Sequence, residues 1–200
     1  MIPRHLVIAI VVLLLAVFAM GIYAGHIRGR AVQAPPIVDN RPVAPPVSGP
    51  TEQVTLYLAY DDSGTLRPQG ASIPLPSNRQ QRAEELLRAL LGVYLAKNSP
   101  HPLAPGGEIR AVYVVTPGIA VIDFNAAFAN GHRSGVLVEE LTVASFIQTL
   151  AANIPGFLRV RILVDGHDRE TLAGHADLAD FYDVSAINQL VSQMQVQSGQ

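Results

Sequence analysis

Residues 108–125 read EIRAVYVVTPGIAVIDFN, and residues 136–166 read VLVEELTVASFIQTLAANIPGFLRVRILVDG. In the first stretch, two β-rich runs flank Pro117-Gly118, a pair that supplies the backbone angles of a type II turn and so predicts a hairpin. In the second stretch, apolar residues recur at helical spacing until Pro155, which cannot continue a helix. Residues 158–164 then alternate between apolar and charged side chains, as in a half-buried strand. We therefore expect strand, turn, strand, helix and strand at the centre of the chain.

The part of the chain before this centre adds one more strand and one more helix. Residues 54–60 alternate as a strand and run into Asp61-Asp62-Ser63-Gly64, which is typical of a turn. Residues 66–76 contain prolines and are expected to form an irregular loop, and residues 83–94 carry apolar side chains at helical spacing. The resulting β-α-β-β-α-β order is that of a split-βαβ fold. We expect an α+β domain with a single sheet and two helices on one face.

Several segments, taken in their order and spacing, resemble the GerMN domain of sporulation and spore-germination proteins and of many bacterial envelope proteins. The segments are VTLYLAYDDSGTLRP at 54–68, AEELLRALLGVY at 83–94, VIDFN at 121–125, LTVASFIQTL at 141–150, RVRILVDG at 159–166 and Gly174-His175. The resemblance covers roughly residues 54–177. It implies a unit related to the ring-building motif of secretion-system rings, and a role in bracing or building envelope assemblies.

The amino-terminal residues 6–24 form an uncharged apolar run, LVIAIVVLLLAVFAMGIYA. At ~1.5 Å per residue this run reaches about 28 Å, close to the ~30 Å hydrocarbon core of a bilayer. A cleaved signal peptide is the competing interpretation. The length of the run, and two arginines before the weak cleavage-like site at 32–34, favour an uncleaved transmembrane helix.

These features divide the chain into four parts. They are a transmembrane anchor at 1–32, a proline-rich linker at 33–53, a GerMN-like domain at 54–180, and a carboxy-terminal helix with a frayed tail at 181–200. The few arginines beside the apolar run do not decide its orientation. The resemblance to an extracytoplasmic family implies a single-pass protein of the cell membrane, with its amino terminus in the cytoplasm and its domain outside.

The composition excludes several classes of function. The chain has no cysteine, so it forms neither a disulfide nor a thiolate metal site. Its net charge of −2 and scattered basic residues give no footprint for nucleic acid. Gly106-Gly107 is not followed by the Lys-Ser/Thr of a phosphate-binding loop. We expect no catalytic, cofactor or metal site, and therefore no enzyme.

The helix at 136–154 carries an uncharged polar stripe, which consists of Thr142, Ser145, Thr149 and Asn153. An exposed helix normally carries lysine and glutamate, whereas an uncharged stripe lets another protein approach without burying a charge. We predict that these four residues contact a partner, either another envelope protein or a second copy of the chain. An ordinary solvated face, or a face covered by the carboxy-terminal tail, is the alternative.

Two other functions stay open. Loops at 61–64, 101–108 and 167–175 could together line a cleft for peptidoglycan or a small ligand. His167, Asp168 and His175 could hold a metal ion in a hydrolase, since imidazoles and carboxylates are zinc ligands. The spacing of the two histidines matches no helical metal motif such as H-E-x-x-H, which makes this the weaker hypothesis.

Overall fold

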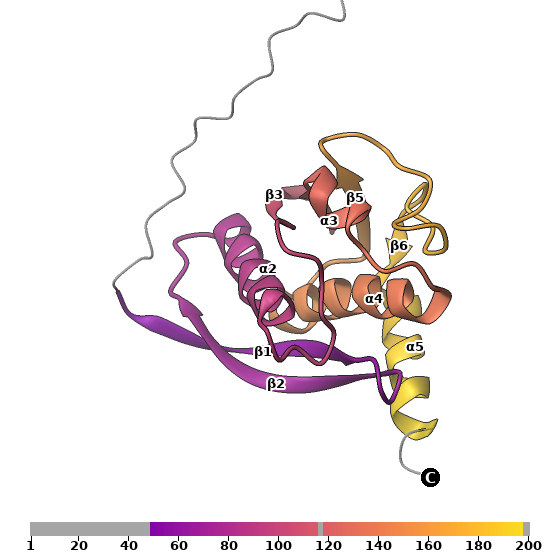
Figure 1. Ribbon diagram of the computed structural model, residues 1–200. Coiled ribbons are helices and arrows are strands. Elements are labelled where there is room, and N and C mark those ends of the chain that lie inside the picture. Colours follow the sequence, from indigo (N-terminus) through magenta and orange to yellow (C-terminus); the bar gives the residue numbers. More distant parts are fainter. Residues whose placement is uncertain (1–48, 116–117, 198–200) are drawn as a thin grey trace, which may run out of the picture. The chain divides into compact units, whose positions relative to one another are not determined.

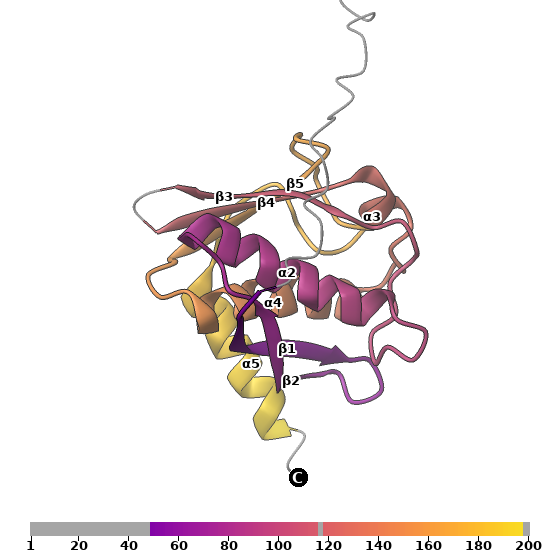
Figure 2. The same ribbon diagram turned by 90° about the vertical axis from the view of Figure 1, so that its left-hand side faces the viewer.

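The computed structural model describes residues 49–115 and 118–197. Their elements form three layers, which Figure 2 shows edge-on: a mixed sheet above, helices in the middle and a separate hairpin below. The sheet has the order β3-β4-β5-β6, and its strands are β3 (Ile109–Val115), β4 (Ile119–Phe124), β5 (Arg159–Val164) and β6 (Tyr182–Asp183). The fold is therefore α+β, as expected.

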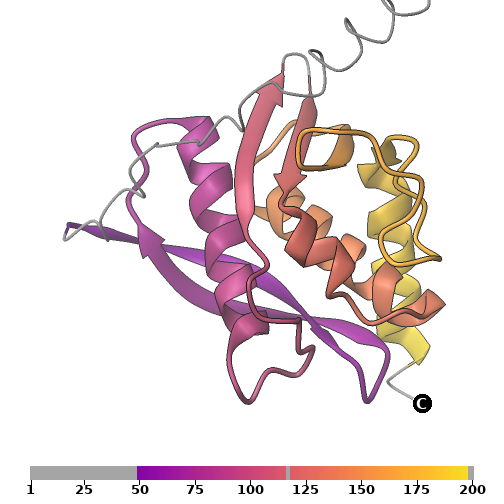
Figure 3. The same cartoon turned by 45° about the horizontal axis from the view of Figure 1, so that its top comes forward.

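The middle layer contains the two long helices α2 (Arg79–Leu95) and α4 (Val136–Asn153). α5 (Val184–Gln197) packs on the side of α4 away from α2, as Figures 1 and 3 show. A short helix, α3 (Ala126–Asn130), follows β4.

The predicted centre of the chain is confirmed. β3 and β4 are antiparallel, and α4 crosses over to β5, which lies parallel to β4 with Ile122 opposite Ile162. Gly118 has the positive φ, 77°, that its place in the predicted turn requires, whereas Pro117 lies outside the described residues.

The prediction that all strands form a single sheet is wrong. β1 (Thr51–Tyr60) pairs only with β2 (Thr65–Pro74), in a hairpin that is not part of the larger sheet. β2 occupies most of the segment 66–76 that we expected to be an irregular loop. β1 also begins three residues before the predicted domain boundary at 54, inside the predicted linker.

Pro68 gives β2 the sequence pattern of a loop, and its place at the outer edge of the hairpin explains how the strand forms. Tyr57 directs its backbone N–H and C=O toward α4, so it makes no hydrogen bond to Pro68, its partner on β2. The ring nitrogen of Pro68 consequently lies on the outer side of the hairpin, where β1 needs no donor. A proline is tolerated at such an edge position, and it also removes a donor that another strand could use.

α4 is buried on nearly all sides because it lies between the two sheets and between α2 and α5. Leu141, Phe146 and Leu150 are fully buried toward the core, and so are the polar side chains of Ser145 and Thr149. A helix surrounded by protein needs no charged face, which accounts for the absence of charge between residues 141 and 153.

Within the described part of the chain, the helices are all too short or too polar to cross a bilayer. The predicted anchor at residues 6–24 lies outside the described residues.

Candidate functional site

The polar stripe of α4 (Thr142, Ser145, Thr149 and Asn153) lies inside the molecule. Thr142, Ser145 and Thr149 are 1%, 0% and 0% exposed, and Asn153 is half-buried. The expectation that this stripe is open to solvent is wrong. Of the four side chains, only the half-buried Asn153 leaves surface for the predicted contact with a partner, which stays a prediction.

Most of the stripe is hydrogen-bonded to the backbone of β1. The Thr55 N–H donates to Asn153 Oδ1 at 3.0 Å, and the Asn153 Nδ2 amide donates back to the Thr55 carbonyl at 2.6 Å. The Tyr57 N–H donates to Thr149 Oγ1 at 2.9 Å, and the Ser145 hydroxyl donates to the Tyr57 carbonyl at 2.6 Å. The side chains of one helix therefore replace the neighbouring strand that β1 lacks on this edge.

Tyr94 of α2 makes the next contact along β1, at Ala59. Its hydroxyl accepts a hydrogen bond from the Ala59 N–H at 2.8 Å and also bonds the hydroxyl of Ser145. Burial raises the pKa of Tyr94 to about 12, so this hydroxyl keeps its proton.

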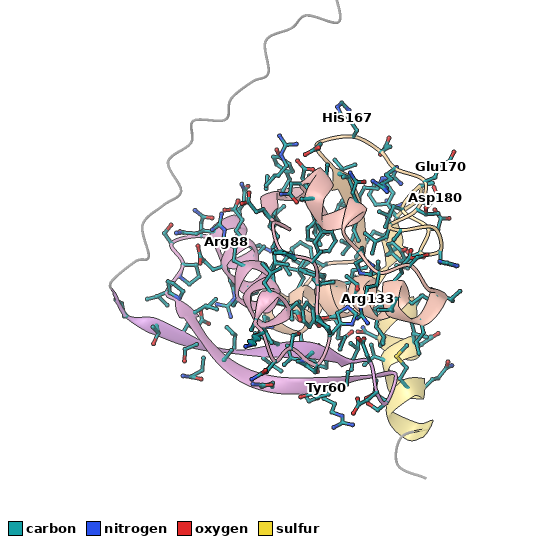
Figure 4. The ribbon with its side chains drawn as sticks, viewed as in Figure 1. Tyr60, Arg88, Arg133, His167, Glu170 and Asp180 are labelled. Atoms are coloured by element: carbon teal, nitrogen blue, oxygen red, sulfur yellow. The ribbon has the colours of Figure 1, made fainter. Side chains whose placement is uncertain are left out.

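Thr142, the first residue of the stripe, belongs to a second polar cluster. His101 Nδ1 lies 2.5 Å from Asp61 Oδ1, and His101 Nε2 lies 2.6 Å from Thr142 Oγ1. His132 Nε2 approaches the same hydroxyl at 2.7 Å, and its Nδ1 donates to the Arg133 carbonyl at 2.7 Å. Arg133, labelled in Figure 4, forms an ion pair with Asp61. Carboxylate, imidazole and hydroxyl thus stand in the order of a hydrolase triad.

This cluster is not arranged for nucleophilic catalysis. The Thr142 hydroxyl donates to the Val138 carbonyl at 3.0 Å, and the side chain is buried inside a helix. The cavity beside it measures about 10 Å³, room for about one water molecule, and apart from Thr142 its lining is apolar and includes Phe124, Phe128 and Phe146. A substrate carbonyl therefore cannot reach the hydroxyl, and the cluster joins loops to α4 instead.

The charges of the cluster are set by burial and by its internal partners. Burial lowers the pKa of His101 and of His132, and this outweighs the opposite influence of Asp61 on His101 and of the Arg133 carbonyl on His132. Burial raises the pKa of Asp61, but the hydrogen bonds and charges of Arg133 and His101 outweigh it and leave that pKa below its ordinary value. Burial therefore favours the neutral form of both imidazoles, and the partners of Asp61 favour its ionised form.

Glu139, in the first turn of α4, holds a loop that follows β5. Its carboxylate is 0% exposed and accepts four backbone N–H groups, from Gly135, Ala173, His175 and Ala176, at 2.9 to 3.0 Å. Burial raises the pKa of Glu139, but these hydrogen bonds, and one from the His175 ring, outweigh burial and lower the pKa to about 2. The Gly174-His175 pair of the sequence pattern is thus part of an anchored loop.

The three residues considered for a metal site do not converge. His167 is exposed and points away from the molecule in Figure 4. Asp168 is bonded to Arg161 at 2.6 Å, and His175 Nδ1 lies 3.0 Å from Glu139. Throughout residues 49–115 and 118–197, no three histidine or carboxylate side chains are grouped so as to hold a metal ion.

Neither of the two cavities described here is lined by all three of the loops expected to form a cleft. The loops of Asp61 and His101 do meet, but through buried contacts, while His167 lies on a separate exposed loop. An open groove of about 580 Å³ instead lies at the start of α2, lined by Glu52, Leu75, Pro76, Ser77, Asn78, Arg79, Arg82, Asn153, Ile154 and Pro155.

Comparison with known proteins places this α+β domain in a family. A family model named Germane, with the description sporulation and spore germination, matches residues 55–170. The chain belongs to this family of GerMN-domain proteins, as the resemblance indicated. No curated protein matches the chain.

Three solved structures are similar in fold. A Clostridium perfringens protein named as a lipoprotein is 19% identical over 74% of this chain and 96% of that chain, with a TM-score of 0.47. The tandem GerMN domains of the sporulation protein GerM from Bacillus subtilis are 21% identical over 67% of this chain and 46% of that chain, with a TM-score of 0.49. The first GerMN domain of GerM is 18% identical over 64% of this chain and 94% of that chain, with a TM-score of 0.45.

Replacing Thr149 with valine tests the contact between the polar stripe and β1. The change keeps the shape of the side chain but leaves the part-buried Tyr57 N–H without its acceptor, so we expect the free energy of unfolding to fall by about 1–3 kcal/mol. Urea denaturation measures this. Thr51→Val, at an exposed position of β1, is the matched control and should change stability by less than about 0.5 kcal/mol. Equal effects of the two substitutions would show that the stripe does not support β1.

Replacing Glu139 with glutamine tests the anchored loop. The uncharged amide accepts fewer and weaker hydrogen bonds than the carboxylate. We therefore expect the free energy of unfolding to fall by about 2–4 kcal/mol. Amide hydrogen exchange should accelerate most at Ala173, His175 and Ala176. The neighbouring Glu140 is exposed, and Glu140→Gln should change neither measurement appreciably. Unchanged exchange in Glu139→Gln would contradict the assignment.

The buried histidines predict loss of stability at mildly acidic pH. Because the folded-state pKa of His101 and His132 lies below the unfolded value of 6.5, the unfolded chain binds more protons, and stability falls as pH drops below about 6.5. The pKa of Glu139 is also lowered, to about 2, but from an unfolded value of 4.5. Its contribution to folding stability is therefore lost in a separate window, as pH falls from about 4.5 toward 2. Urea unfolding between pH 7.5 and 5 checks the first window. The double change His101→Gln and His132→Gln should reduce the dependence of the unfolding free energy on pH in this range. His167→Gln, at the surface, should leave that dependence unchanged.

Proposed function

We propose that the chain is a non-enzymatic, membrane-anchored envelope protein whose GerMN domain acts outside the cytoplasm through contacts with other proteins. Membership of a sporulation and spore-germination family supports an envelope role. The apolar run at residues 6–24 supports the anchor. The buried polar groups described above bind each other and the backbone, so they serve the fold and leave function to the surface.

One observation carries the proposal, namely the open outer face of β3 and β4. Tyr113 and Val115 point away from the helices and are 46% and 47% exposed. Their partners on β4 are Val121 and Ile119, which are half-buried, so the two cross-strand pairs form a contiguous apolar surface. An aromatic side chain set among aliphatic ones on a rigid sheet is typical of the centre of a protein interface.

Two arginines of β5 stand at the rim of this surface, and one of them, Arg161, is paired with Asp168. Arg159 and Arg161 on β5 lie over the ring of Phe181, at 5.0 and 5.6 Å from its centroid. Arg159 is exposed, so a partner that combines an apolar strip with a carboxylate beside it fits this face. We propose that such a strip on another envelope protein covers Tyr113 and Val115.

Site-specific photo-cross-linking tests the proposal. A benzophenone-bearing phenylalanine analogue at position 113 of the full chain should form protein adducts in intact cells. The same analogue at Gln69, which is exposed on β2, is the matched control and should form several-fold fewer. Val115→Glu should abolish the adducts at 113 without changing thermal stability by more than about 0.5 kcal/mol. Protein adducts of equal yield at 113 and 69 would refute the proposed face.

Peptidoglycan binding is the second candidate, and the groove at the start of α2 favours it. Ser77, Asn78, Arg79 and Arg82 line this groove and could bond sugar hydroxyls or peptide carboxylates. Sedimentation of the purified chain with peptidoglycan would support this function. Cross-linked adducts at position 113 that carry glycan rather than protein would favour peptidoglycan binding over contact with another protein.

A further inference from the structure

The groove at the start of α2 combines an apolar floor with a cationic wall. Its volume of about 580 Å³ falls within the roughly 300–1,000 Å³ that is usual for small-ligand sites. Leu75 is 54% exposed on its floor, beside Pro76 and Pro155, so an apolar surface is open to a ligand. The charged residues of its lining are two arginines and one glutamate, so one positive charge is not balanced within the groove.

Arg79 is held in place with most of its hydrogen-bond donors unused. Its Nη2 donates to the Pro155 carbonyl at 2.7 Å, and its guanidinium lies over the ring of Phe157, 4.8 Å from the centroid. This hydrogen bond uses one of five N–H donors, and within residues 49–115 and 118–197 no other acceptor bonds the guanidinium. The side chain is also exposed. A cation that is already ordered can bind an anion at little further cost in entropy.

The side-chain acceptors of the groove, in contrast, are already engaged. Both carboxylate oxygens of Glu52 accept from Arg82. The amide oxygens of Asn78 and Asn153 each accept a backbone N–H, at 2.8 and 3.0 Å. Sugar hydroxyls both donate and accept hydrogen bonds, whereas an ionised carboxylate only accepts. A lining that offers donors and few acceptors therefore suits a carboxylate better than a sugar.

We propose that the groove binds the free carboxylate of a short peptide, and that its apolar floor receives the small side chain beside that carboxylate. The planar guanidinium of Arg79 matches a carboxylate in shape as well as in charge. The proposal rests on the second candidate function, peptidoglycan binding, and assigns recognition to the peptide stems of peptidoglycan rather than to its sugars. One solvent-exposed ion pair is weak, so a dipeptide should bind with a dissociation constant on the order of 1 mM.

Titration of the purified full chain with N-acetyl-alanyl-alanine, followed by NMR, tests the proposal. The Nε–H signal of Arg79 and the backbone N–H signal of Asn78 should shift as the dipeptide is added. The same dipeptide with an amide in place of its carboxylate keeps its shape but lacks the charge, and it should bind several-fold more weakly. Added salt should weaken binding of the acid and leave binding of the amide unchanged, because ions screen an exposed charge pair.

Matched variants separate recognition from folding. Arg79→Gln should weaken binding of the acid several-fold, and Arg79→Lys, which keeps the charge but not the planar group, should weaken it less. Arg88→Gln is the control, since Arg88 is exposed farther along the same helix and does not line the groove (Figure 4). Glu52→Gln removes the charge that neutralises Arg82 and should strengthen binding several-fold. Such a gain in affinity cannot come from a misfolded domain.

Several results would overturn the proposal. They are equal binding of the acid and the amide, equal effects of Arg79→Gln and Arg88→Gln, or weaker binding in Glu52→Gln. If an oligomer of N-acetylglucosamine shifts the same signals and the dipeptide does not, the groove recognises sugars, and the carboxylate site is refuted while peptidoglycan binding stands. If the dipeptide binds as expected but the chain does not sediment with peptidoglycan, the carboxylate site stands and the peptidoglycan function is refuted.

Discussion

The hydrogen bonds between α4 and β1 are the interaction on which the arrangement of the domain depends. Four residues of an α-helix advance about 6.0 Å, and two residues of a strand advance about 6.6 to 6.8 Å. Ser145, Thr149 and Asn153 recur every four residues, so they keep pace with Thr55 and Tyr57, and Tyr94 of α2 takes the next position, Ala59. Short polar side chains at this spacing can therefore bond a strand edge that no other strand covers. The β1–β2 hairpin can stand apart from the main sheet because α4 bonds its inner edge.

This contact also explains the unusual composition of α4. The helix meets the β1–β2 hairpin on one side and α2 and α5 on two others. Its Phe146 packs on Phe124 of the larger sheet, so neither an apolar nor a charged stripe dominates its surface. The same end of the helix fixes the surrounding loops. Thr142 receives the two histidines and Glu139 receives the loop of His175, so residues distant in sequence meet within one turn of α4. The polar interior is thus a set of structural contacts centred on one helix.

Local signals in the sequence were sufficient for the central strands and for α2, α4 and α5. The predictions fail where one residue type is compatible with two structural environments, and only the tertiary structure decides between them. A proline excludes a residue from an inner strand position but not from an outer one, and the sequence does not say which side of β2 faces β1. An uncharged stripe fits a partner protein or the chain's own strand equally well. His101 and His132 had no periodic or motif signal, since their meeting depends on loops whose paths are set by Thr142. The sequence offers only a weak clue to Glu139, which is one of two adjacent acids before the uncharged stretch that begins at residue 141.

The two meanings of an uncharged helical stripe differ in what the helix must satisfy. The stripe of α4 faces backbone groups that would be buried without partners, so folding itself accounts for its serine, threonine and asparagine. The exposed side of α5, whose polar residues are Ser185, Asn188, Gln189, Ser192 and Gln193, has no buried backbone opposite it in the described part of the chain, so water solvates it. The same uncharged pattern therefore has a structural cause on α4 and none on α5. Burial, which depends on the tertiary structure, is what separates the two cases, and the pattern of residues along the helix does not.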